Sequence, residues 1–465
     1  MTFKAIHPPT AKQLDTLGLG PDTMPSAGRL VDCPVKLEFS PCPNSAWDKA
    51  CALDQGGQTS TQQPDVEAVT GTTYYVSTSG TLDSRGTKES PWATLQQAIG
   101  VVQPGDKVIV GRGTHKGVRF PKLAGKDGEP PKGSVAGTAK APIVVMADPD
   151  VEHGGVVITG TDTDKGGFTL EAGCDYVHIV GFTIENTKEW GVLFDGTTGN
   201  RLLGNTIRGV TGHSGVSVVG TDVVIAGNTV TDTHKRDSKS TTSGHGVTVS
   251  DNSKGVSIIN NDIRDNEFTG IQITSENGIV EDLVVEENFI GGNGGNGING
   301  DGSVKGRFQN NVIAKNERNG IVLYSIDIKE RDPEASSRDN QVANNTIYQP
   351  NGSALKIGKG GSIGDLAANN LLGGGINMEG EAPGFVAFGN FSDLSPDVFV
   401  DLAAGDYRLA PNGPAFGAGV PSRDGFTAPK DADGRSPIGA FKFRQPGSAP
   451  MPTSPSPAGE SEIIE

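Results

Sequence analysis

The chain has 465 residues, of which 34% are hydrophobic and 67 are glycine, and its formal net charge is −16. This negative charge excludes a nucleic-acid backbone as the expected partner, because like charges repel. No apolar run is long enough for a transmembrane helix. The first residues, 1–9, lack the apolar centre of a secretory signal. The sequence indicates no oligomeric state.

Residues 1–70 hold three of the four cysteines and show no strong period. The spacing of Cys33, Cys42 and Cys51 is too wide for a Cys-x-x-Cys metal site. A disulfide within this segment, a disulfide from one of these residues to Cys174, and reduced buried thiols all remain open, because four cysteines allow three pairings. We interpret residues 1–70 as an extended arm or a small cap.

A helix is expected after a first strand at residues 74–80. Ser90 is suited to be its N-cap and Pro91 its first-turn residue. Apolar residues recur at helical spacing over 91–102, namely Trp92, Leu95, Ile99 and Val102. A helix here would cover the open end of a repetitive core, which such folds require. Repeating coils are expected from about residue 107 to about residue 391.

The middle of the chain repeats a short motif in which an asparagine precedes two mostly apolar residues. Its seven copies begin at Asn205, Asn228, Asn261, Asn288, Asn311, Asn345 and Asn370. Successive copies are 23 to 34 residues apart, with β-branched residues and no helical stripe between them. A period of this length predicts a solenoid of strands. Asparagine tolerates a left-handed backbone and its amide can bond the equivalent amide one coil away, so the series predicts a ladder at a tight bend. The predicted fold is all-β, a right-handed parallel β-helix.

A second series, in which glycine precedes an aliphatic residue, fixes the strand phase. Because side chains alternate between the two faces of a strand, the inward residues are Val216, Val218, Val247, Val249, Ile271, Ile273, Ile321 and Leu323. Two outward columns follow, the first being Ser217, Thr248, Gln272, Asn299 and Val322, and the second Val219, Ser250, Thr274, Asp301 and Tyr324. This predicted outer face is mostly polar, as is usual for a sheet that faces water.

Two coils carry long insertions beside this polar face. The first, 231–244, enters one glycine strand, and the second, 325–339, leaves another about three coils later. Together they are expected to bound a groove across the face. Long loops on a rigid scaffold commonly carry function, although a tolerated surface insertion is the alternative.

Several segments resemble secreted bacterial right-handed parallel β-helix proteins that act on carbohydrates. Segments 74–80, 90–98 and 104–114 look like the opening of that group, and segments 406–419 and 433–440 are similar to its closing part. The group includes chondroitinase B-like and alginate polysaccharide lyases, pectate lyase-like solenoids and, more distantly, C5-epimerases. The resemblance implies a β-helix domain over 71–443, an extracellular or cell-surface location and a polysaccharide partner. Residues 444–465, rich in Pro and Ser, are expected to be a disordered tail.

Eliminative cleavage of a uronate-containing acidic polysaccharide needs neutralisation of the carboxylate, a base for the C5 proton and an acid for the leaving oxygen. Candidate catalytic residues near the predicted groove are His245, His213, Tyr324, Arg236 and Lys235. Candidate substrate-binding residues are Thr248, Gln272, Asn299, Arg318 and Trp190. The resemblance makes Ca²⁺ a candidate cofactor, with Asp301, projecting from the face, and Asn299 as oxygen ligands. The alternative for each histidine, and for Asp301, is an ordinary turn residue.

Three functions remain open at this stage. The first is a polysaccharide lyase, in which His245 leads the candidates because it ends the first insertion. The second is a glycoside hydrolase, which would need two carboxylates in the groove from among Asp237, Asp301 and Asp327. The third is a non-catalytic glycan-binding or adhesin-like protein, which would show stacked aromatic side chains instead of a poised acid or base.

Overall fold

The structure is a computed structural model. It describes residues 71–120, 135–160, 166–237, 240, 242–275, 278–325, 337–359, 363–379, 382–392, 394–411, 413–422, 426, 428 and 436–440, all of which belong to one compact unit. The predictions for residues 1–70, for most of the second insertion and for the tail after residue 443 lie outside the described residues. None of the described helices is long and apolar enough to cross a membrane.

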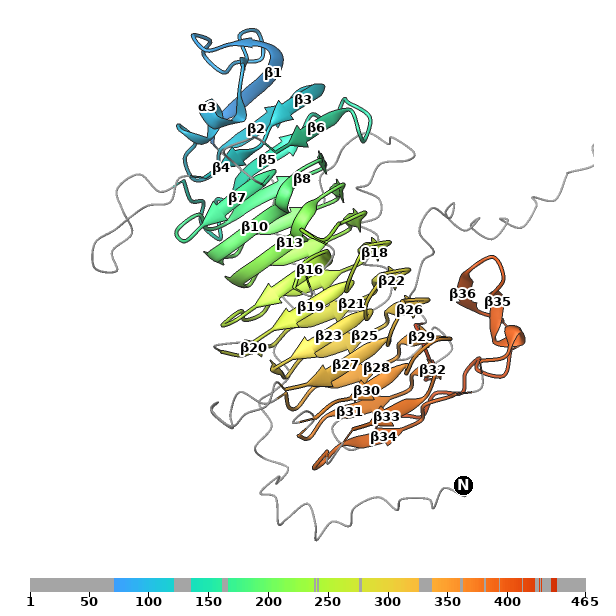
Figure 1. Cartoon of the computed structure of the whole chain (residues 1–465). Helices are drawn as coiled ribbons and strands as arrows, with labels where there is room; N and C mark the ends of the chain where they lie inside the picture. Colours follow the sequence, from blue (N-terminus) through green and yellow to red (C-terminus); the bar gives the residue numbers. More distant parts are fainter. Residues whose placement is uncertain are drawn as a thin grey trace, which may run out of the picture. The chain divides into compact units, whose positions relative to one another are not determined.

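Three long sheets carry the fold, one strand of each per coil (Figure 1). The first, sheet A, consists of β1 (Thr73–Thr81), β2 (Lys107–Val110), β5 (Ile143–Ala147), β8 (Val177–Val180), β11 (Arg201–Leu203), β14 (Val224–Ala226), β17 (Ser257–Ile259), β21 (Val284–Glu286), β25 (Arg307–Gln309), β28 (Gln341–Ala343), β31 (Leu366–Ala368) and β34 (Val386–Phe388). The second, sheet B, consists of β3 (Gly113–Lys116), β6 (Val156–Thr159), β9 (Thr183–Glu185), β12 (Thr206–Arg208), β15 (Thr229–Thr231), β18 (Asp262–Arg264), β22 (Phe289–Gly291), β26 (Val312–Ala314), β29 (Thr346–Tyr348) and β32 (Leu371–Gly373). The third, sheet C, consists of β4 (Val118–Arg119), β7 (Phe168–Glu171), β10 (Lys188–Thr198), β13 (Thr211–Thr221), β16 (His245–Ser250), β19 (Ile271–Thr274), β23 (Ile298–Asp301), β27 (Ile321–Tyr324), β30 (Leu355–Ile357) and β33 (Ile376–Met378).

Every described pairing within these sheets is parallel. Each coil therefore runs through sheets A, B and C and returns to sheet A one strand further along, which confirms the predicted solenoid. A two-stranded extension, β20 (Val280–Glu281) with β24 (Ser303–Val304), adds to two of the coils. The stack begins earlier than predicted, because β1 already pairs with β2.

The predicted asparagine ladder runs along the turn from sheet A to sheet B. Each side-chain amide donates to the side-chain oxygen of the next asparagine, at 2.8 to 3.1 Å, from Asn205 through Asn228, Asn261, Asn288, Asn311, Asn345 and Asn370 to Asn390. The ladder therefore extends one member beyond the predicted seven. A second ladder, which we did not predict, joins Asn266, Asn293 and Asn316 on the turn from sheet B to sheet C.

The left-handed backbone at this bend belongs to the residue before each ladder asparagine. Positive φ angles of 52° to 65° occur at Gly204, Gly227, Asn260, Glu287, Asn310, Asn344, Asn369 and Gly389, and at none of the ladder asparagines. The left-handed conformation was expected at the ladder asparagines themselves, and this expectation is wrong. It is physically reasonable that two consecutive residues share these tasks, because the ladder residue has to point its side chain inward while the residue before it makes the bend.

The core lies between the three sheets and has the predicted phase. All eight predicted inward residues of sheet C are completely buried. The register between neighbouring strands agrees with this phase, because Val216 pairs with Val247 and Val247 pairs with Ile271. Cys174 is also completely buried in this core, and burial raises the pKa of its thiol to about 11. Cys33, Cys42 and Cys51 lie outside the described residues, so the disulfide alternatives stay untested.

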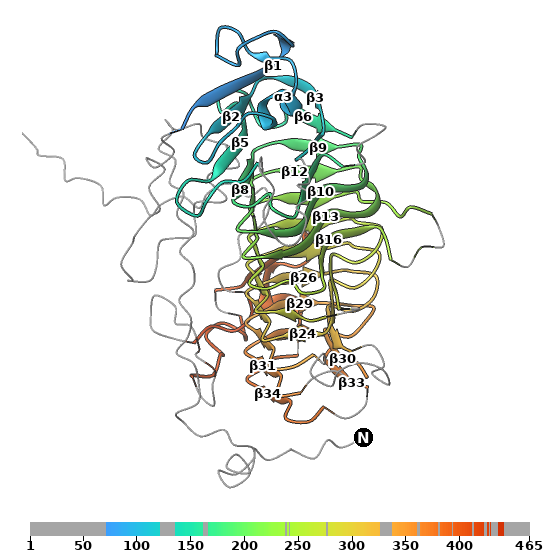
Figure 2. The same cartoon turned by 90° about the vertical axis from the view of Figure 1, so that its left-hand side faces the viewer.

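The capping helix is shorter than predicted and begins later. It is α3 (Leu95–Ile99), and Thr94, not Ser90, is its N-cap, forming a capping box with Gln97. Trp92 lies before the helix, where its indole N–H donates to the Ser84 carbonyl at 2.8 Å. The predicted apolar residues are nevertheless buried in the core, and α3 lies at the end of the stack beside β1 (Figure 2).

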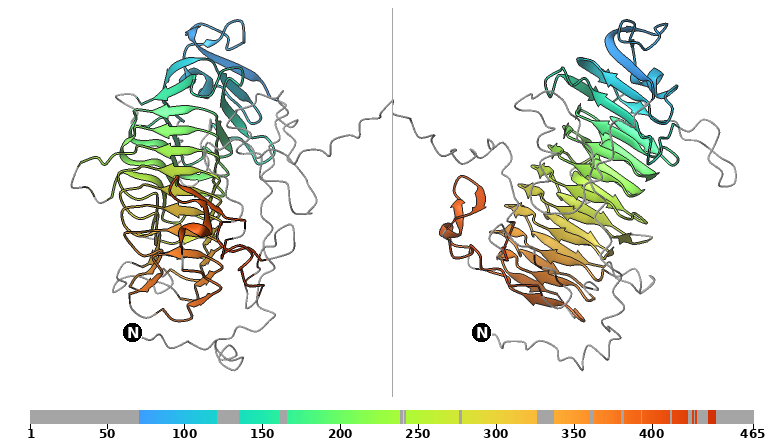
Figure 3. Two further views of the ribbon diagram at one scale, coloured as in Figure 1. Left: turned by 90° about the vertical axis from the view of Figure 1, so that its right-hand side faces the viewer. Right: turned by 180° about the vertical axis from the view of Figure 1, so that it is seen from behind.

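The C-terminal part of the described chain packs on the outside of the coils (Figure 3). It contains a short 3₁₀ helix, η3 (Pro396–Val398), and an antiparallel pair, β35 (Phe399–Asp401) with β36 (Asp406–Leu409). Tyr407 of β36 lies against Phe289 and Tyr348, which project from sheet B. This segment therefore covers the last strands of sheet B, from β22 to β32.

Candidate functional site

The outer face of sheet C has the predicted order of side chains. Strand register aligns Ser217, Thr248, Gln272, Asn299 and Val322 in one column. The first insertion enters this sheet as predicted, since β15 ends at Thr231 and β16 begins at His245. Of this column, Gln272 and Asn299 are half-buried, whereas Thr248 is almost completely buried. Thr248 is therefore poorly placed for the substrate-binding role predicted for it.

Two histidines meet at the start of strands β13 and β16. His245 is the first residue of β16 and pairs in register with Ser214, so His213 lies one strand away. The centroids of the two imidazole rings are 6.2 Å apart, in an edge-to-face arrangement. Nδ1 of His213 lies 3.1 Å from the Ser214 hydroxyl. The juxtaposition of the two histidines expected from the sequence is thus present.

The two histidines differ in burial, and that difference separates their possible roles. His245 is 3% exposed, and among the described residues its Nδ1 has no hydrogen-bond partner. Burial, together with His213 and Lys235 nearby, lowers the pKa of His245 to about 3. His213 is half-buried, and burial, followed by the charge of Arg236, lowers its pKa, while Glu189 acts in the opposite direction. Both imidazoles are therefore neutral near pH 7.

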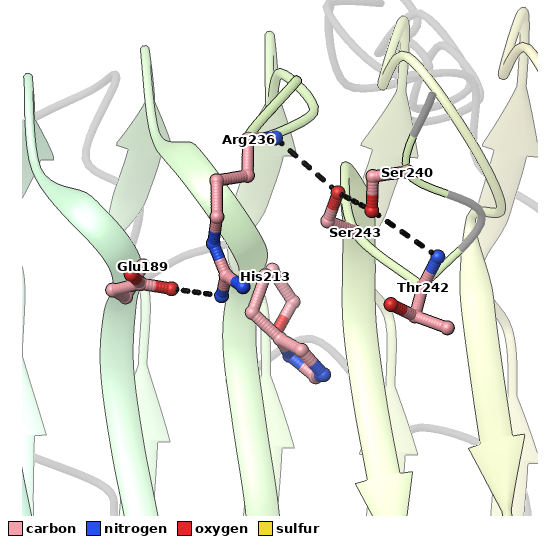
Figure 4. Close-up of polar contacts among 7 residues, drawn as sticks. Glu189, His213, Arg236, Ser240, Thr242 and Ser243 are labelled. Atoms are coloured by element: carbon pink, nitrogen blue, oxygen red, sulfur yellow. Dashed lines mark hydrogen bonds and ion pairs between the residues drawn. The ribbon is translucent and has the colours of Figure 1, made fainter. Parts of the chain in front are cut away.

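Arg236 reaches the histidines from the first insertion. In Figure 4 its side chain extends towards Glu189 and ends beside His213. Its guanidinium forms an ion pair with the Glu189 carboxylate, and its backbone N–H donates to the Ser243 hydroxyl at 3.2 Å. Glu189 is held in the left-handed region with φ of 68°. The insertion is thus tied to β10 through Glu189, and its outgoing and returning segments are joined by the contact between Arg236 and Ser243.

Two further cations lie over one aromatic ring next to His245. The ring of Phe268 is 5.2 Å from that of His245 between centroids. Lys235 Nζ lies 4.8 Å from the Phe268 centroid, and Arg318 Cζ lies 5.5 Å from it. Cations at this distance are attracted to the ring face. The structure therefore brings the predicted Lys235 and Arg318 together through an aromatic residue.

Trp190 also belongs to this end of the sheet. It precedes the glycine of its strand, as His245 does, and it pairs in register with Ser214. Its indole N–H donates to the Thr169 hydroxyl at 3.2 Å, and the side chain is half-buried. We define the cationic histidine site as His213, His245, Lys235, Arg236, Phe268 and Arg318, with Trp190 and Glu189 at its border.

Tyr324 belongs to a different part of the face. It lies on β27, three strands beyond β16 in the sheet order. Its hydroxyl is 3.1 Å from the side-chain nitrogen of Asn299, which also donates to Gln272 at 3.1 Å. Burial, and then the nearby Asp301, raise the pKa of the phenol. Tyr324 and His245 are both predicted to line the groove, and they lie three strands apart in sheet C.

Asp301 does not project from the face as expected. It is completely buried, because Tyr324, its register partner, lies beside it. Asn299 uses its amide oxygen to accept from Asn296 at 3.0 Å. Among the described residues no group of three or more His, Cys, Asp or Glu side chains is arranged to hold a metal ion. Calcium at Asp301 and Asn299 therefore stays a prediction, and we derive no chemical step through it.

Sequence reasoning missed Glu189 and Phe268. The pattern that could have found Phe268 is its position two residues before the strand glycine, which His213 and Arg318 also occupy in their own coils. Glu189 occupies the same position, two residues before Gly191, so this pattern could have found it as well. Its contact with Arg236, however, depends on how the insertion folds. The expected groove stays a prediction, since residues 326–336 of the second insertion lie outside the described part of the chain.

Comparison with known proteins agrees with this architecture. A family model described as "Right handed beta helix region" matches residues 150–281 and 238–386, slightly more than half the chain. The chain therefore belongs to the right-handed parallel β-helix family, and the predicted handedness is confirmed. No curated protein matches the sequence.

Two of the solved structures of similar fold are named as lyases. The pectate lyase Pel9A is 16% identical, with a TM-score of 0.61, over 80% of this chain and 97% of that one. An alginate lyase from Paenibacillus sp. str. FPU-7 is also 16% identical, with a TM-score of 0.46, over 69% of this chain and 99% of that one. At such identities the likeness establishes the fold alone, and function has to be argued from the site.

Proposed function

We propose that this protein is a polysaccharide lyase that cleaves a uronate-containing acidic polysaccharide by β-elimination at the cationic histidine site. The observation that carries the proposal is the half-buried, neutral His213 lying beside Arg236, with Lys235 and Arg318 further along the site over the Phe268 ring. A neutral imidazole among cations combines a base with groups that attract a carboxylate. The net charge of the whole chain would repel an acidic polymer, so attraction has to be local.

The reaction assigns a role to each group. His213 accepts the proton from C5 of the uronate, the C5 electron pair forms the double bond to C4, and the bond from C4 to the leaving oxygen breaks. The imidazolium formed in the first step is then the acid that returns a proton to that oxygen. Lys235 and Arg318 face the substrate carboxylate and stabilise the charge that develops on it. His245, which is buried, positions His213 through the contact between the rings.

The burial of His245 changes the choice of base from the one the sequence suggested. A proton acceptor has to reach the substrate, and His245 is 3% exposed, whereas His213 is half-buried. A base also works best when its pKa is near the working pH, and the pKa of about 3 at His245 is far below neutrality. His213 therefore suits the role better.

A glycoside hydrolase is less well supported by the described residues. It needs two accessible carboxyl groups about 5 to 9 Å apart. Of the three carboxylates proposed from the sequence, Asp237 is exposed, Asp301 is completely buried and Asp327 lies outside the described residues. Glu189, which borders the site, is in an ion pair with Arg236. Action outside the cell or at its surface, where such polymers occur, is part of the proposal.

The test is incubation of the purified protein with polygalacturonate, alginate, unsulfated chondroitin and rhamnogalacturonan, with and without a calcium chelator. We expect unsaturated uronate ends, seen by their ultraviolet absorbance, from at least one polymer. Loss of product with chelator and recovery with added Ca²⁺ would support the calcium prediction. Reducing ends without unsaturation would replace the lyase by a hydrolase, and binding without any cleavage would leave a glycan-binding protein.

A further inference from the structure

The outer face of sheet C differs in chemical character between the strands β19, β23 and β27 and the segments that lead into its strands. Of the residues in β19, β23 and β27, all of which the structure describes, Asp301 alone is charged, and it is completely buried. The cations of the cationic histidine site lie before the strands instead, with Lys235 near His245 and both Lys235 and Arg318 over the Phe268 ring. The sheet therefore has a cationic margin where its strands begin and a neutral region within these three strands.

The neutral region is a connected set of amides and a phenol. The side-chain nitrogen of Asn299 donates to Gln272 Oε1 and to the Tyr324 hydroxyl, both at 3.1 Å. The side-chain oxygen of Asn299 accepts from Asn296 at 3.0 Å, and Asn296 in turn accepts from Asn319 at 3.0 Å. All five side chains are half-buried, so the contacts within the set fix their orientation while part of each remains accessible. We call these residues the amide platform.

The amide platform matches uncharged sugar hydroxyls. Amides and hydroxyls offer donors and acceptors together, as sugar hydroxyls do. The raised pKa of Tyr324 keeps its hydroxyl protonated and able to donate. A carboxylate bound at Gln272, Asn299 and Tyr324 would lose hydration and would lie near the buried Asp301, which is unfavourable.

We propose that the amide platform binds a neutral sugar residue of the same polymer whose uronate is cleaved at the cationic histidine site, so that the substrate is a mixed polysaccharide in which uronates and neutral sugars are interspersed. This inference rests on the proposed lyase function. In the sheet order, β23 is three strands from β13, and three inter-strand steps of about 4.8 Å make roughly 14 Å. One sugar ring cannot touch both His213 on β13 and Asn299 on β23, so different residues of one chain occupy these two positions.

The experiment compares two kinds of polymer and two matched variants. The polymers are polygalacturonate and alginate, which contain uronates only, and rhamnogalacturonan and unsulfated chondroitin, in which uronates alternate with neutral sugars. The first variant, Asn299→Asp, keeps the size of the side chain but removes donors and adds a negative charge. The control, Asn377→Asp, makes the same change at an exposed residue of β33 that continues the same outward column beyond Lys356. Thermal unfolding of both variants checks that they fold.

We expect the wild-type protein to have a higher kcat/KM on a mixed polymer than on either homopolymer. Asn299→Asp should lower the ratio of kcat/KM on the mixed polymer to kcat/KM on the homopolymer by about tenfold. The change should come mainly from KM on the mixed polymer, because polar contacts made in binding are lost. Asn377→Asp should leave the ratio unchanged. A wild-type preference for a homopolymer, or an unchanged ratio in Asn299→Asp, overturns the inference and leaves the lyase function standing.

If no polymer is cleaved, the proposed lyase function is wrong, but sugar binding by the amide platform can still be tested. The binding arm then uses affinity electrophoresis of the wild type and Asn299→Asp through gels that contain rhamnogalacturonan. Retardation of the wild type that is lost in Asn299→Asp supports the neutral-sugar site on its own. Absence of retardation overturns the site together with the function.

Discussion

The imidazole ring of His213 meets that of His245 edge to face, with 6.2 Å between the centroids. One ring is half-buried and the other is 3% exposed. The two rings come together from adjacent coils because His245 pairs in register with Ser214, the residue that follows His213. The first insertion completes the arrangement by bringing Arg236 to the half-buried ring of His213 (Figure 4).

The first prediction concerns His213 as the base. His213→Ala should lower kcat by about 10²- to 10⁴-fold, the usual contribution of a positioned base, with a smaller effect on KM. The substitution is in a half-buried position, so circular dichroism and thermal unfolding should be close to wild type. Steady-state kinetics on the best polymer measures the effect. Full turnover in a folded His213→Ala protein would remove His213 from the mechanism.

The second prediction concerns the acid limb of the pH profile. His213 acts in its neutral form, and its pKa is lowered, so kcat/KM should fall only below the ordinary histidine value of about 6.5. Arg236 lowers this pKa and Glu189 raises it. Arg236→Gln should therefore move the limb to higher pH, and Glu189→Gln should move it to lower pH. Equal shifts in one direction for both variants would contradict this electrostatic account.

The third prediction concerns His245 and stability. Its folded-state pKa of about 3 is below the unfolded value of about 6.5, so between these values the unfolded state binds a proton that the folded state does not. The free energy of unfolding should then fall as pH drops below about 6.5, by up to about 1.4 kcal/mol per pH unit from this group. His245→Gln should reduce that slope. Urea denaturation of both proteins at several pH values measures the slope. The pKa of His178 is also lowered to about 3, but His178 is present in both proteins and its contribution therefore cancels in the difference.

The repeats were sufficient to predict the coils, because each ladder asparagine and each inward aliphatic residue repeats a local requirement once per turn. The phase of sheet C followed from alternation alone, and Ile271 and Ile321 are buried as it required. The capping helix was misjudged because Ser90 and Pro91 satisfy the local rules for a helix start, whereas Trp92 is held to the strand β1 by tertiary bridges to Val76 and Thr81.

Only the part of the candidate site that depends on strand register could be predicted from the sequence. Register along the sheet placed His213 beside His245, and this depends on spacing that the sequence shows. The burial of Asp301 and the ion pair of Arg236 with Glu189 depend on side chains from other coils and on the path of an insertion. No periodic pattern encodes such contacts.

The fourth prediction concerns the core. Ile271→Ala should reduce the free energy of unfolding by about 2 to 5 kcal/mol, as cavities in packed cores do, because Ile271 is completely buried. The control Leu82→Ala, at a residue that is 70% exposed, should change it by less than about 0.5 kcal/mol. Chemical denaturation measures both. A loss at Ile271 no larger than at Leu82 would show that the strand phase is wrong.

The fifth prediction concerns the cations over Phe268. Lys235 Nζ and Arg318 Cζ lie 4.8 and 5.5 Å from the ring centroid, and both cations belong to the region that is proposed to receive a carboxylate. On an acidic polymer the wild-type KM should therefore rise as salt is added, because salt screens this attraction. Lys235→Gln and Arg318→Gln should each raise KM at low salt and flatten its dependence on salt, with a smaller effect on kcat. The matched control is Lys305→Gln, at a lysine that pairs with Glu281 away from the site and should leave the dependence unchanged. Initial rates across a salt series give the slopes, and identical slopes in all four proteins would place the attraction of the polymer elsewhere.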